Sequence, residues 1–422
     1  MVQVILGIGI FAATLGAILA RPARISEAQA ALLGAAAMLV TGIVRPEQAV
    51  TAVLHDWNVY LFFLGLMISA ALAEQAGVFR LLAGYAVRWA GGSTRRLYAA
   101  VFAIGVGVTA VLSNDATAIL LTPVVAALVL GLDLPPMPFL FATTFIADTA
   151  SFLLPVSNPI NVLVLGEQID LALFLRFLFV PGVLASATNY LVFAWWFRDD
   201  LRGHYDPARW RVVLPNDRSV AHRMLIGLVG LALAYVLGSW MRLPLGLVAV
   251  SGALTLGLLA WATGTLTWST LRRGISWSLF GFLTGMVVIV QGLHELAITE
   301  RFGALLLALG EGSSFRAILV TAFGAALGSN LINNVPMALV MRATLSDAGL
   351  PASQLQALQY ATVLGADLGP NVTTVGSLAT ILWVLQLRRY GITVSLRQYL
   401  FLGLLVVPPM LLIGTLMIWL QT

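Results

Sequence analysis

The sequence contains no cysteine and no lysine. Without cysteine, the chain can form neither a disulfide nor a thiolate metal site. Without lysine, it has no Gly-x-x-x-x-Gly-Lys-Ser/Thr loop to hold the phosphates of a nucleotide. Any active process in which the chain takes part must therefore draw its energy from an ion gradient or from a separate ATPase.

Charge is also scarce. Charged residues make up 10% of the 422 residues, whereas 60% are hydrophobic. Apolar runs of about 17–25 residues recur along the chain, and each is long enough to cross the ~30 Å hydrocarbon layer of a lipid bilayer. The composition predicts an all-α polytopic membrane protein. The first run, 2–20, lacks a basic segment and an Ala-x-Ala cleavage site, so we expect a retained helix and not a signal peptide.

The net charge of +5 comes from 23 basic residues, all of them arginine. No basic stripe or nucleic-acid module accompanies them, so nucleic acid is not an expected partner. Most stand in loops, which is typical of positive-inside placement. The most polar segment, 198–223, carries six arginines and four aspartates and is the predicted cytoplasmic linker between a first half, 1–197, and a second half, 224–422. A cytoplasmic linker leaves six arginines outside, Arg45 and Arg342 among them, and places both termini outside.

Two apolar segments contain prolines and polar residues in their middle. The first, 138–165, includes Ala-Asp-Thr-Ala-Ser-Phe-Leu-Leu-Pro-Val-Ser-Asn-Pro, and the second, 356–387, includes Ala-Asp-Leu-Gly-Pro-Asn-Val-Thr-Thr-Val-Gly-Ser. Proline removes a backbone donor and breaks a helix, and the freed carbonyls are tolerated at membrane depth only where they line a protein-buried cavity. We therefore expect two broken helices at a binding site.

Two further apolar segments are interrupted by amides. The segment 97–131 is interrupted at Ser113-Asn114-Asp115, and the segment 315–345 at Ser329-Asn330-Leu331-Ile332-Asn333-Asn334. Each arm of the first is only about 16 residues long, which is short for a full crossing. The pattern predicts two re-entrant hairpins with these residues at their tips.

The interruptions repeat at a fixed spacing. Asn114 and Asn334 lie 220 positions apart, and Asp148 and Asp367 lie 219 apart. Two halves with matching interrupted hydrophobic segments are the sequence sign of a secondary transporter with a site near the bilayer midplane. Because the predicted linker follows an odd number of crossings, the two halves are expected to be inverted relative to each other.

Three aspartates stand at membrane depth, where ionisable groups are functional candidates by default: Asp115, Asp148 and Asp367. We expect them to take part in proton coupling. Asp148 and Asp367 have the alternative role of capping half-helices. Asp115 has no acidic counterpart, because Val335 stands at the matching position, and this asymmetry favours a specific function for it.

The tips and breaks also carry small polar side chains or a glycine, which we take as candidate substrate-binding positions. They are Asn114, Thr117, Ser157, Asn158, Asn330, Asn333, Asn334, Thr373, Thr374, Gly376 and Ser377. Their alternative role is to bond the backbone that the interruptions free. A cavity lined by them would hold no arginine, which argues against di- and tricarboxylates and suits a neutral polyhydroxyl molecule or a small cation.

Four motifs resemble a known family. They are Ser-Asn-Asp with Leu-Thr-Pro (113–123), Ile-Ala-Asp-Thr-Ala-Ser with Val-Ser-Asn (146–158), Asn-Asn-Val-Pro (333–336), and Gly-Ala-Asp-Leu-Gly-Pro with Val-Gly-Ser-Leu-Ala-Thr-Ile-Leu-Trp (365–383). In these residues, and over nearly its whole length, the chain resembles the ArsB arsenite efflux pumps of the ion transporter superfamily. One departure is Thr374, where that family often has proline.

The resemblance implies an arsenical-resistance antiporter of the plasma membrane that expels arsenite and antimonite in exchange for protons. It implies no enzymatic activity, no cofactor and no metal beyond the transported As(III) and Sb(III), and it admits a cytoplasmic arsenite-stimulated ATPase as a partner. Arsenite is mostly the neutral trihydroxide near neutral pH, which agrees with a cavity free of arginine. The absence of cysteine agrees as well, because a thiolate would hold soft As(III) strongly and slow its release.

Two other functions are open to such a sequence. A sodium/proton antiporter of the same superfamily is the main alternative, since amides, hydroxyls and backbone carbonyls also suit Na⁺. An intramembrane aspartyl protease is disfavoured, because Asp148 follows alanine and Asp367 stands in Gly-Ala-Asp, whereas such proteases need tyrosine and Gly-x-Gly around their aspartates.

Overall fold

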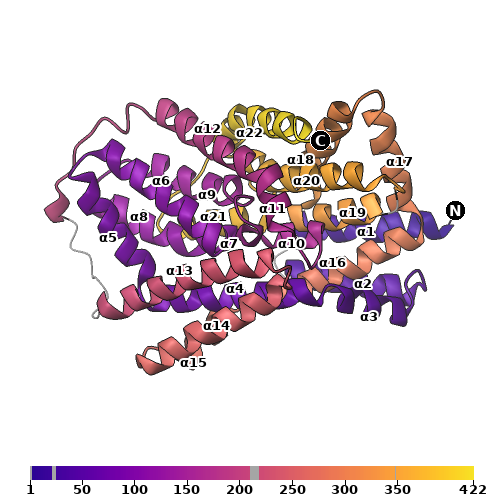
Figure 1. Ribbon diagram of the computed structural model, residues 1–422, viewed down its shortest axis with the longest axis horizontal. Helices are drawn as coiled ribbons and strands as arrows, with labels where there is room; N and C mark the ends of the chain where they lie inside the picture. The colour runs from indigo at the N-terminus through magenta and orange to yellow at the C-terminus, as the bar shows by residue number, and fades with distance from the viewer. Residues whose placement is uncertain (1, 21–24, 210–217, 347) are drawn as a thin grey trace.

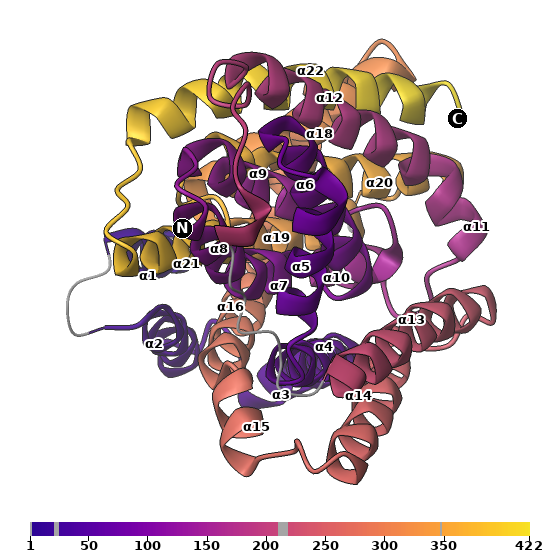
Figure 2. The ribbon, with the colours of Figure 1, turned by 90° about the vertical axis from the view of Figure 1, so that its left-hand side faces the viewer.

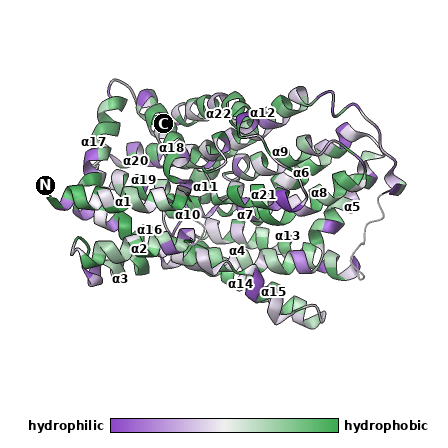
Figure 3. Ribbon diagram, turned by 180° about the vertical axis from the view of Figure 1, so that it is seen from behind, coloured by the Kyte–Doolittle hydropathy of each residue, from purple (hydrophilic) through white to green (hydrophobic). Residues whose placement is uncertain are grey.

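The computed structural model describes residues 2–20, 25–209, 218–346 and 348–422. Within these residues the protein is helical apart from one isolated bridge between Ser93 and His204. Nine helical segments of the described chain are long and apolar enough to cross a membrane. Figure 3 shows mainly hydrophobic residues along the outer helices and many of the hydrophilic ones at their ends and in the connecting loops.

The elements of the first half are α1 (Val2–Ala20), α2 (Glu27–Val40), α3 (Pro46–His55), α4 (Trp57–Gln75), α5 (Val78–Ala90), α6 (Thr94–Val111), α7 (Asn114–Ala116), η1 (Thr117–Leu121), α8 (Thr122–Gly131), α9 (Pro136–Thr149), η2 (Pro155–Ser157), α10 (Pro159–Leu165), α11 (Leu171–Phe174), η3 (Leu175–Phe179) and α12 (Val180–Trp196). The turn η1 continues α7 into α8, and η3 continues α11 into α12, so each set forms one helical rod.

The remaining elements are η4 (Pro207–Arg209) in the linker, then α13 (Arg218–Trp240), α14 (Leu245–Ala262), α15 (Trp268–Gly274), α16 (Trp277–Glu295), α17 (Ile298–Gly310), α18 (Ser314–Ile332), α19 (Asn334–Ser346), α20 (Ala352–Leu368), η5 (Gly369–Val372), α21 (Leu378–Arg389) and α22 (Leu396–Trp419). Helix α17 was not predicted, because Glu300 and Arg301 in its first turn make the segment resemble a loop between apolar runs.

The elements repeat with the spacing of the motifs. Helices α4 and α16 both have 19 residues, and α5 and α17 both have 13. The first arms of the two hairpins also begin alike: Ser93 caps α6 through the backbone N–H of Arg96, and Ser313 caps α18 through that of Arg316. A serine oxygen that accepts from the first turn satisfies a donor that the helix leaves free.

The two halves are interlocked. Helix α2 packs along α16, and its counterpart α14 packs along α4, so each half contributes a helix to the other. Glycines allow the close approach: a Cβ on Gly65 would lie 2.4 Å from the backbone of Ala249, and one on Gly285 would lie 2.4 Å from the backbone of Ala31. The helices α2–α4 and α13–α16 form a layer below the rest of the molecule in Figures 1 and 2.

The helices of the two predicted hairpins lie toward opposite ends of the molecule (Figure 1). Helices α5, α6 and α8 lie toward the left-hand end, with the linker, whereas α17 and the arms α18 and α19 lie toward the right-hand end. The short helices α7 and α10 lie between them, in the middle of the molecule. Both termini lie toward the end away from the linker.

Candidate functional site

Both helices that were predicted to break are interrupted in the structure. In the first, α9 ends at Thr149 and α10 begins at Pro159. Asn158 caps α10, because its Oδ1 accepts a hydrogen bond from the N–H of Ile160 over 3.1 Å. Asn161 donates to the carbonyls of Ser151 and Leu154 and so fixes the loop between the two half-helices.

The second break is tied to the tip of the second hairpin. The side-chain amide of Asn330 donates to the carbonyl of Gly369 over 2.7 Å, and its Oδ1 accepts from the Thr373 hydroxyl over 2.8 Å. The backbone N–H of Asn334 donates to the carbonyl of Gly376 over 2.9 Å. Ser377 caps α21, as Asn158 caps α10 in the first half.

The first hairpin is attached to the first break in a similar way. The Ser157 hydroxyl donates to the carbonyl of Ala110, near the end of α6. At the tip, the hydroxyls of Thr117 and Thr109 lie 2.7 Å apart, and Asn114 accepts from the backbone N–H of Asp115. The second tip is therefore bonded to the break of its own half, and the first break is bonded to the hairpin arm just before the first tip.

At the breaks, two amides join one half to the other. The Asn158 side chain donates to Oδ1 of Asp367 over 2.8 Å, which joins the first break to the second. In the other direction, Asn371 of the second break donates to the carbonyl of Phe145 over 3.1 Å. We call the polar side chains of the tips, the breaks and α12 that gather here the central cluster: Asn114, Asp115, Asp148, Asn158, Asn161, Asn189, Asn330, Asn334, Asp367, Asn371 and Thr373. Within the described residues, none of its hydrogen bonds involves an arginine or a histidine.

The aspartates differ in their exposure. Asp148 is 1% and Asp367 0% exposed, whereas Asp115 is partly exposed. Asp115 and Asp367 lie close enough to Asp148 for negative charges on them to repel. The structure therefore brings together the three carboxyl groups that the sequence singled out.

Several buried oxygens of the central cluster lack a hydrogen-bond partner in the described part of the chain. They are both carboxylate oxygens of Asp148, Oδ2 of Asp367 and the Oδ1 atoms of Asn161, Asn189 and Asn371. The hydroxyls of Thr144 and Tyr399 lie next to each other and close to Asp148. Buried polar atoms are costly unless they are hydrogen-bonded, so the cluster is suited to a guest that supplies mainly donors, such as protons, a cation or hydroxyl groups.

Some candidate positions are occupied by structural contacts. A Cβ on Gly376 would lie 2.6 Å from Cα of Pro370, so this glycine permits a close approach of the backbone. Thr117 is fully buried against Thr109 inside its hairpin. Asn333 has a φ of 74° and bonds the carbonyl of Val375. Thr374 is half-buried.

The sequence-based selection missed two amides, Asn189 and Asn371. Both donate to the Thr149 hydroxyl, over 3.2 and 3.4 Å, and both are fully buried. Asn189 is the one amide in the apolar helix α12, which is a signal that could have found it. Asn371 follows the proline of the second break directly, and this position inside an interrupted apolar segment is the signal that could have found it.

Comparisons with known proteins agree with this architecture. The family described as citrate transporters matches residues 15–365 and, in a second match, 235–421. The arsenical pump membrane protein of Escherichia coli (strain K12) is 32% identical over 416 residues, with 95% of each chain covered. The chain belongs to the arsenical pump membrane protein family. A second member, from Yersinia enterocolitica, is 30% identical over 410 residues, again with 95% of each chain covered.

Membership confirms the family that was predicted from the motifs. It also confirms the prediction that the protein is a transporter and not an enzyme. The fold of this chain is similar to the crystal structure of the YdaH transporter of Alcanivorax borkumensis, with a TM-score of 0.56 and 17% sequence identity. The match covers 85% of this chain and 84% of that chain. This likeness supports the fold: an all-helical multi-pass membrane protein.

Proposed function

We propose that the protein exports trivalent arsenic, as arsenite, and trivalent antimony across the plasma membrane in exchange for protons. The observation that carries the proposal is the central cluster, where unpaired buried oxygens of Asp148, Asp367 and Asn371 gather without an arginine. The names of the relatives, which are arsenical pumps, point to the same cargo.

The chemistry of the cluster favours a neutral polyhydroxyl cargo. Arsenous acid offers three O–H donors to the unpaired oxygens, and its own oxygens can accept from hydroxyls such as those of Thr144 and Tyr399. A tricarboxylate such as citrate would instead need guanidinium or ammonium groups to balance its charge. A cluster built around three carboxyl groups would repel it, so arsenite suits this site better than the cargo for which the family is described.

The proposed architecture consists of two inverted repeats, 1–197 and 224–422, with a cytoplasmic linker at 198–223 and both termini outside. The hairpins are re-entrant, and their tips meet the two broken helices near the bilayer midplane. The matched caps Ser93 and Ser313 support the repeat. Both termini lie toward the end away from the linker, so a cytoplasmic linker would leave both of them on the outer side.

Within the site, we assign the cargo to the polar positions of the tips and breaks, with Asn158 and Ser377 at the two half-helix caps. Asp115 is assigned as the main proton carrier, because it is partly exposed while Asp148 and Asp367 are enclosed. A carboxyl group that alternates between a wet and a closed environment can take up and release a proton as its surroundings change. Asp148 and Asp367 then mainly shape the site.

Arsenite uptake into everted membrane vesicles under an imposed pH gradient tests this function. We expect uptake that requires the protein and collapses when a protonophore is added. Uptake that is absent, or unaffected by the protonophore, contradicts proton-coupled arsenite transport.

A sodium/proton antiporter is the second candidate, and the excess of unpaired oxygens in the central cluster favours it as well. Oxygen atoms of carboxylates, amides and hydroxyls are ligands that hard cations prefer. Sodium-dependent proton movement by the purified protein that arsenite does not alter would favour this function over arsenite export.

A further inference from the structure

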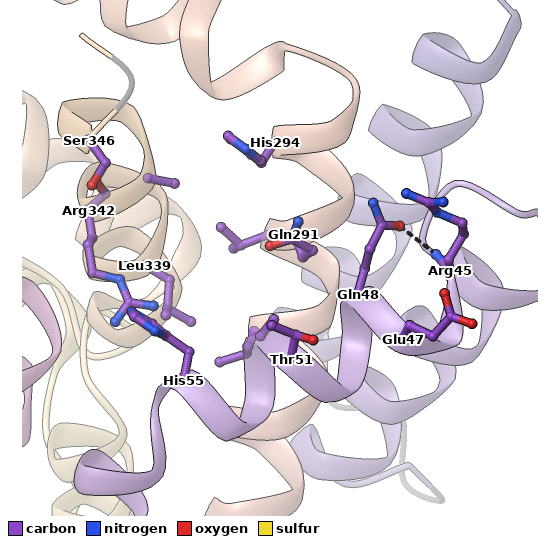
Figure 4. Close-up of a pocket in the computed structure, with 14 residues that line it drawn as sticks. Arg45, Glu47, Gln48, Thr51, His55, Gln291, His294, Leu339, Arg342 and Ser346 are labelled. Carbon is purple, nitrogen blue, oxygen red and sulfur yellow. Dashed lines mark hydrogen bonds between the residues drawn. The ribbon is translucent and has the colours of Figure 1, made fainter. Parts of the chain in front are cut away.

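A pocket of about 680 Å³ lies at the end of the molecule away from the linker. Its walls come from α3, α16 and α19, and its polar lining includes Gln48, Thr51, His55, Gln291 and Arg342. Figure 4 shows Arg342 extending from α19 toward His55 on α3. None of the positions assigned to the central cluster lines this pocket.

Arg342 joins three elements at one end of the pocket. Its guanidinium donates to both carboxylate oxygens of Asp56, over 2.6 and 2.8 Å, and to the carbonyl of Leu163 over 3.2 Å. Asp56 stands between α3 and α4, and Leu163 lies in α10. The ion pair therefore connects the second hairpin and the first broken helix to the lower layer.

The helices joined by Arg342 also lead to the central cluster. Helix α19 begins at the hairpin tip, with Asn334, and reaches Arg342 eight residues later, about 12 Å along the axis at 1.5 Å per residue. Helix α10 is capped by Asn158 and reaches Leu163 five residues later, about 7.5 Å along the axis. The bonds of Arg342 thus lie about one and a half to just over two helical turns from Asn158 and Asn334, and Arg342 itself lines the pocket.

The two partners are unequal. Asp56 is 3% exposed, whereas the side chain of Arg342 is 25% exposed and faces the pocket. Arg342 can leave Asp56 and become hydrated in the pocket, but Asp56 cannot reach water without a rearrangement of α3 and α4. A buried ion pair adds little net stability compared with apolar residues of the same volume. Movement of Arg342 between two positions therefore explains the presence of the ion pair better than a contribution to stability does.

We infer that the Arg342–Asp56 ion pair is a latch that closes the floor of the pocket toward the central cluster, and that this pocket is one of the two routes to the site. The inference rests on the proposed transport function. While the pair is formed, α19 and α10 are held against α4 and the route is shut. When Arg342 turns into the pocket, the route between the pocket and Asn334 opens.

The absence of cysteine makes the latch directly measurable, because one introduced thiol is the only thiol in the protein. Val335 is a buried residue in the first turn of α19, next to Asn334. We would measure how fast a membrane-impermeant maleimide labels Val335→Cys in vesicles of each orientation. Thr51→Cys, on the exposed wall of the pocket, identifies the orientation in which the pocket faces the reagent.

From the pocket side, Val335→Cys is expected to react at least tenfold faster when Arg342→Gln is added. It is expected to return toward its original rate in the charge-exchanged protein with Arg342→Asp and Asp56→Arg, while Thr51→Cys reacts equally in all of them. Equal rates for Val335→Cys with and without Arg342→Gln would overturn the latch. An equal acceleration of Val335→Cys labelling in the charge-exchanged protein would overturn the latch as well.

The single substitution leaves Asp56 buried and unpaired, which can prevent accumulation of the protein. If the single variant does not accumulate, the double variant Arg342→Gln with Asp56→Asn, which removes both charges, replaces it in the experiment. Fast labelling of Val335→Cys in this double variant supports the latch, and slow labelling contradicts it. Since the labelling contains no arsenite, it is independent of the cargo. A protein that labels as expected but does not transport arsenite would refute the proposed function and leave the latch in place.

Discussion

The side-chain amide of Asn158 donates a hydrogen bond to the carboxylate of Asp367 over 2.8 Å, although the two residues lie 209 positions apart. Each stands at the break of a different half. Asn158 also caps α10, so one residue connects the local geometry of the first break to the carboxyl group of the second. We therefore expect that loss of this hydrogen bond lowers transport even where the protein remains folded.

Replacement of Asn158 by alanine should weaken arsenite transport while the protein stays folded in the membrane. The loss of one hydrogen bond, about 1 kcal/mol, corresponds to a roughly fivefold lower apparent affinity. Initial rates of arsenite uptake against concentration would measure it. Asn161→Ala should in addition reduce the amount of folded protein, because both donors of Asn161 bond the loop of the break. Loss of folded protein in Asn158→Ala as well would show that both amides only hold the break.

Replacement of Gly285 by alanine should destabilise the interlocked halves. The new Cβ would lie 2.4 Å from the backbone of Ala31, and a backbone atom cannot move aside as the end of a side chain can. Overpacking of this kind costs about 1–3 kcal/mol, which thermal unfolding of the detergent-solubilised protein would detect. Gly257→Ala in α14 is the control, because nothing lies within 4 Å of its Cβ. An undiminished melting temperature in Gly285→Ala would mean that α2 and α16 can separate without cost.

Replacement of Asp170 by asparagine should lower stability near neutral pH but not in acid. The backbone N–H of Leu173 and, next to it, the guanidinium of Arg242 hold the pKa of the Asp170 carboxyl below its usual value. A carboxyl group whose pKa is lower in the folded chain stabilises the fold above its unfolded pKa, near 4, and that contribution is lost as the pH falls through the folded pKa. Asparagine keeps the helix cap but not the charge. A melting-temperature difference between wild type and Asp170→Asn that stays constant from pH 7 to pH 3 would contradict this reading.

The sequence revealed the interruptions because their causes are local. Prolines and polar residues within apolar runs act on the helix in which they stand, so Pro155 and Pro159 mark the first break without reference to any other part of the chain. The caps were not predicted correctly: capping was considered for Asp148 and Asp367, whereas Asn158 and Ser377, which were expected to bind substrate or freed backbone, cap the half-helices. The spacing of about 220 residues then indicated which interruptions correspond.

Contacts between the halves could not be predicted from such local patterns. Nothing in the pattern around Gly65 or Gly285 says that these glycines face the backbone of a helix from the other half. Arg342 was predicted to face the outer side of the membrane, and its ion pair with Asp56, 286 positions away, emerges only from the packing of α19 on the junction of α3 and α4. Asn371 was missed for the same reason, since its partners lie in α9.

The proposed coupling predicts different roles for the three aspartates. Asp115→Asn should abolish arsenite export driven by a pH gradient while some arsenite binding remains, because the amide keeps the shape of the carboxyl group but cannot carry a proton. Asp148→Asn and Asp367→Asn should lower transport without removing its dependence on the gradient. Uptake into everted vesicles with and without a pH gradient would separate these effects. Gradient dependence that persists in Asp115→Asn would assign the proton to another group.

The most direct measurement is the release of protons from the detergent-solubilised protein when arsenite is added, in weakly buffered solution with a pH indicator. If arsenite and a proton compete for the central cluster, wild type releases protons in proportion to the arsenite bound, Asp115→Asn binds arsenite without release, and the other two variants still release protons. No release from wild type that binds arsenite would contradict the exchange itself. Unchanged release from Asp115→Asn, with release lost in Asp148→Asn or Asp367→Asn, would contradict the assignment of Asp115 as the proton carrier.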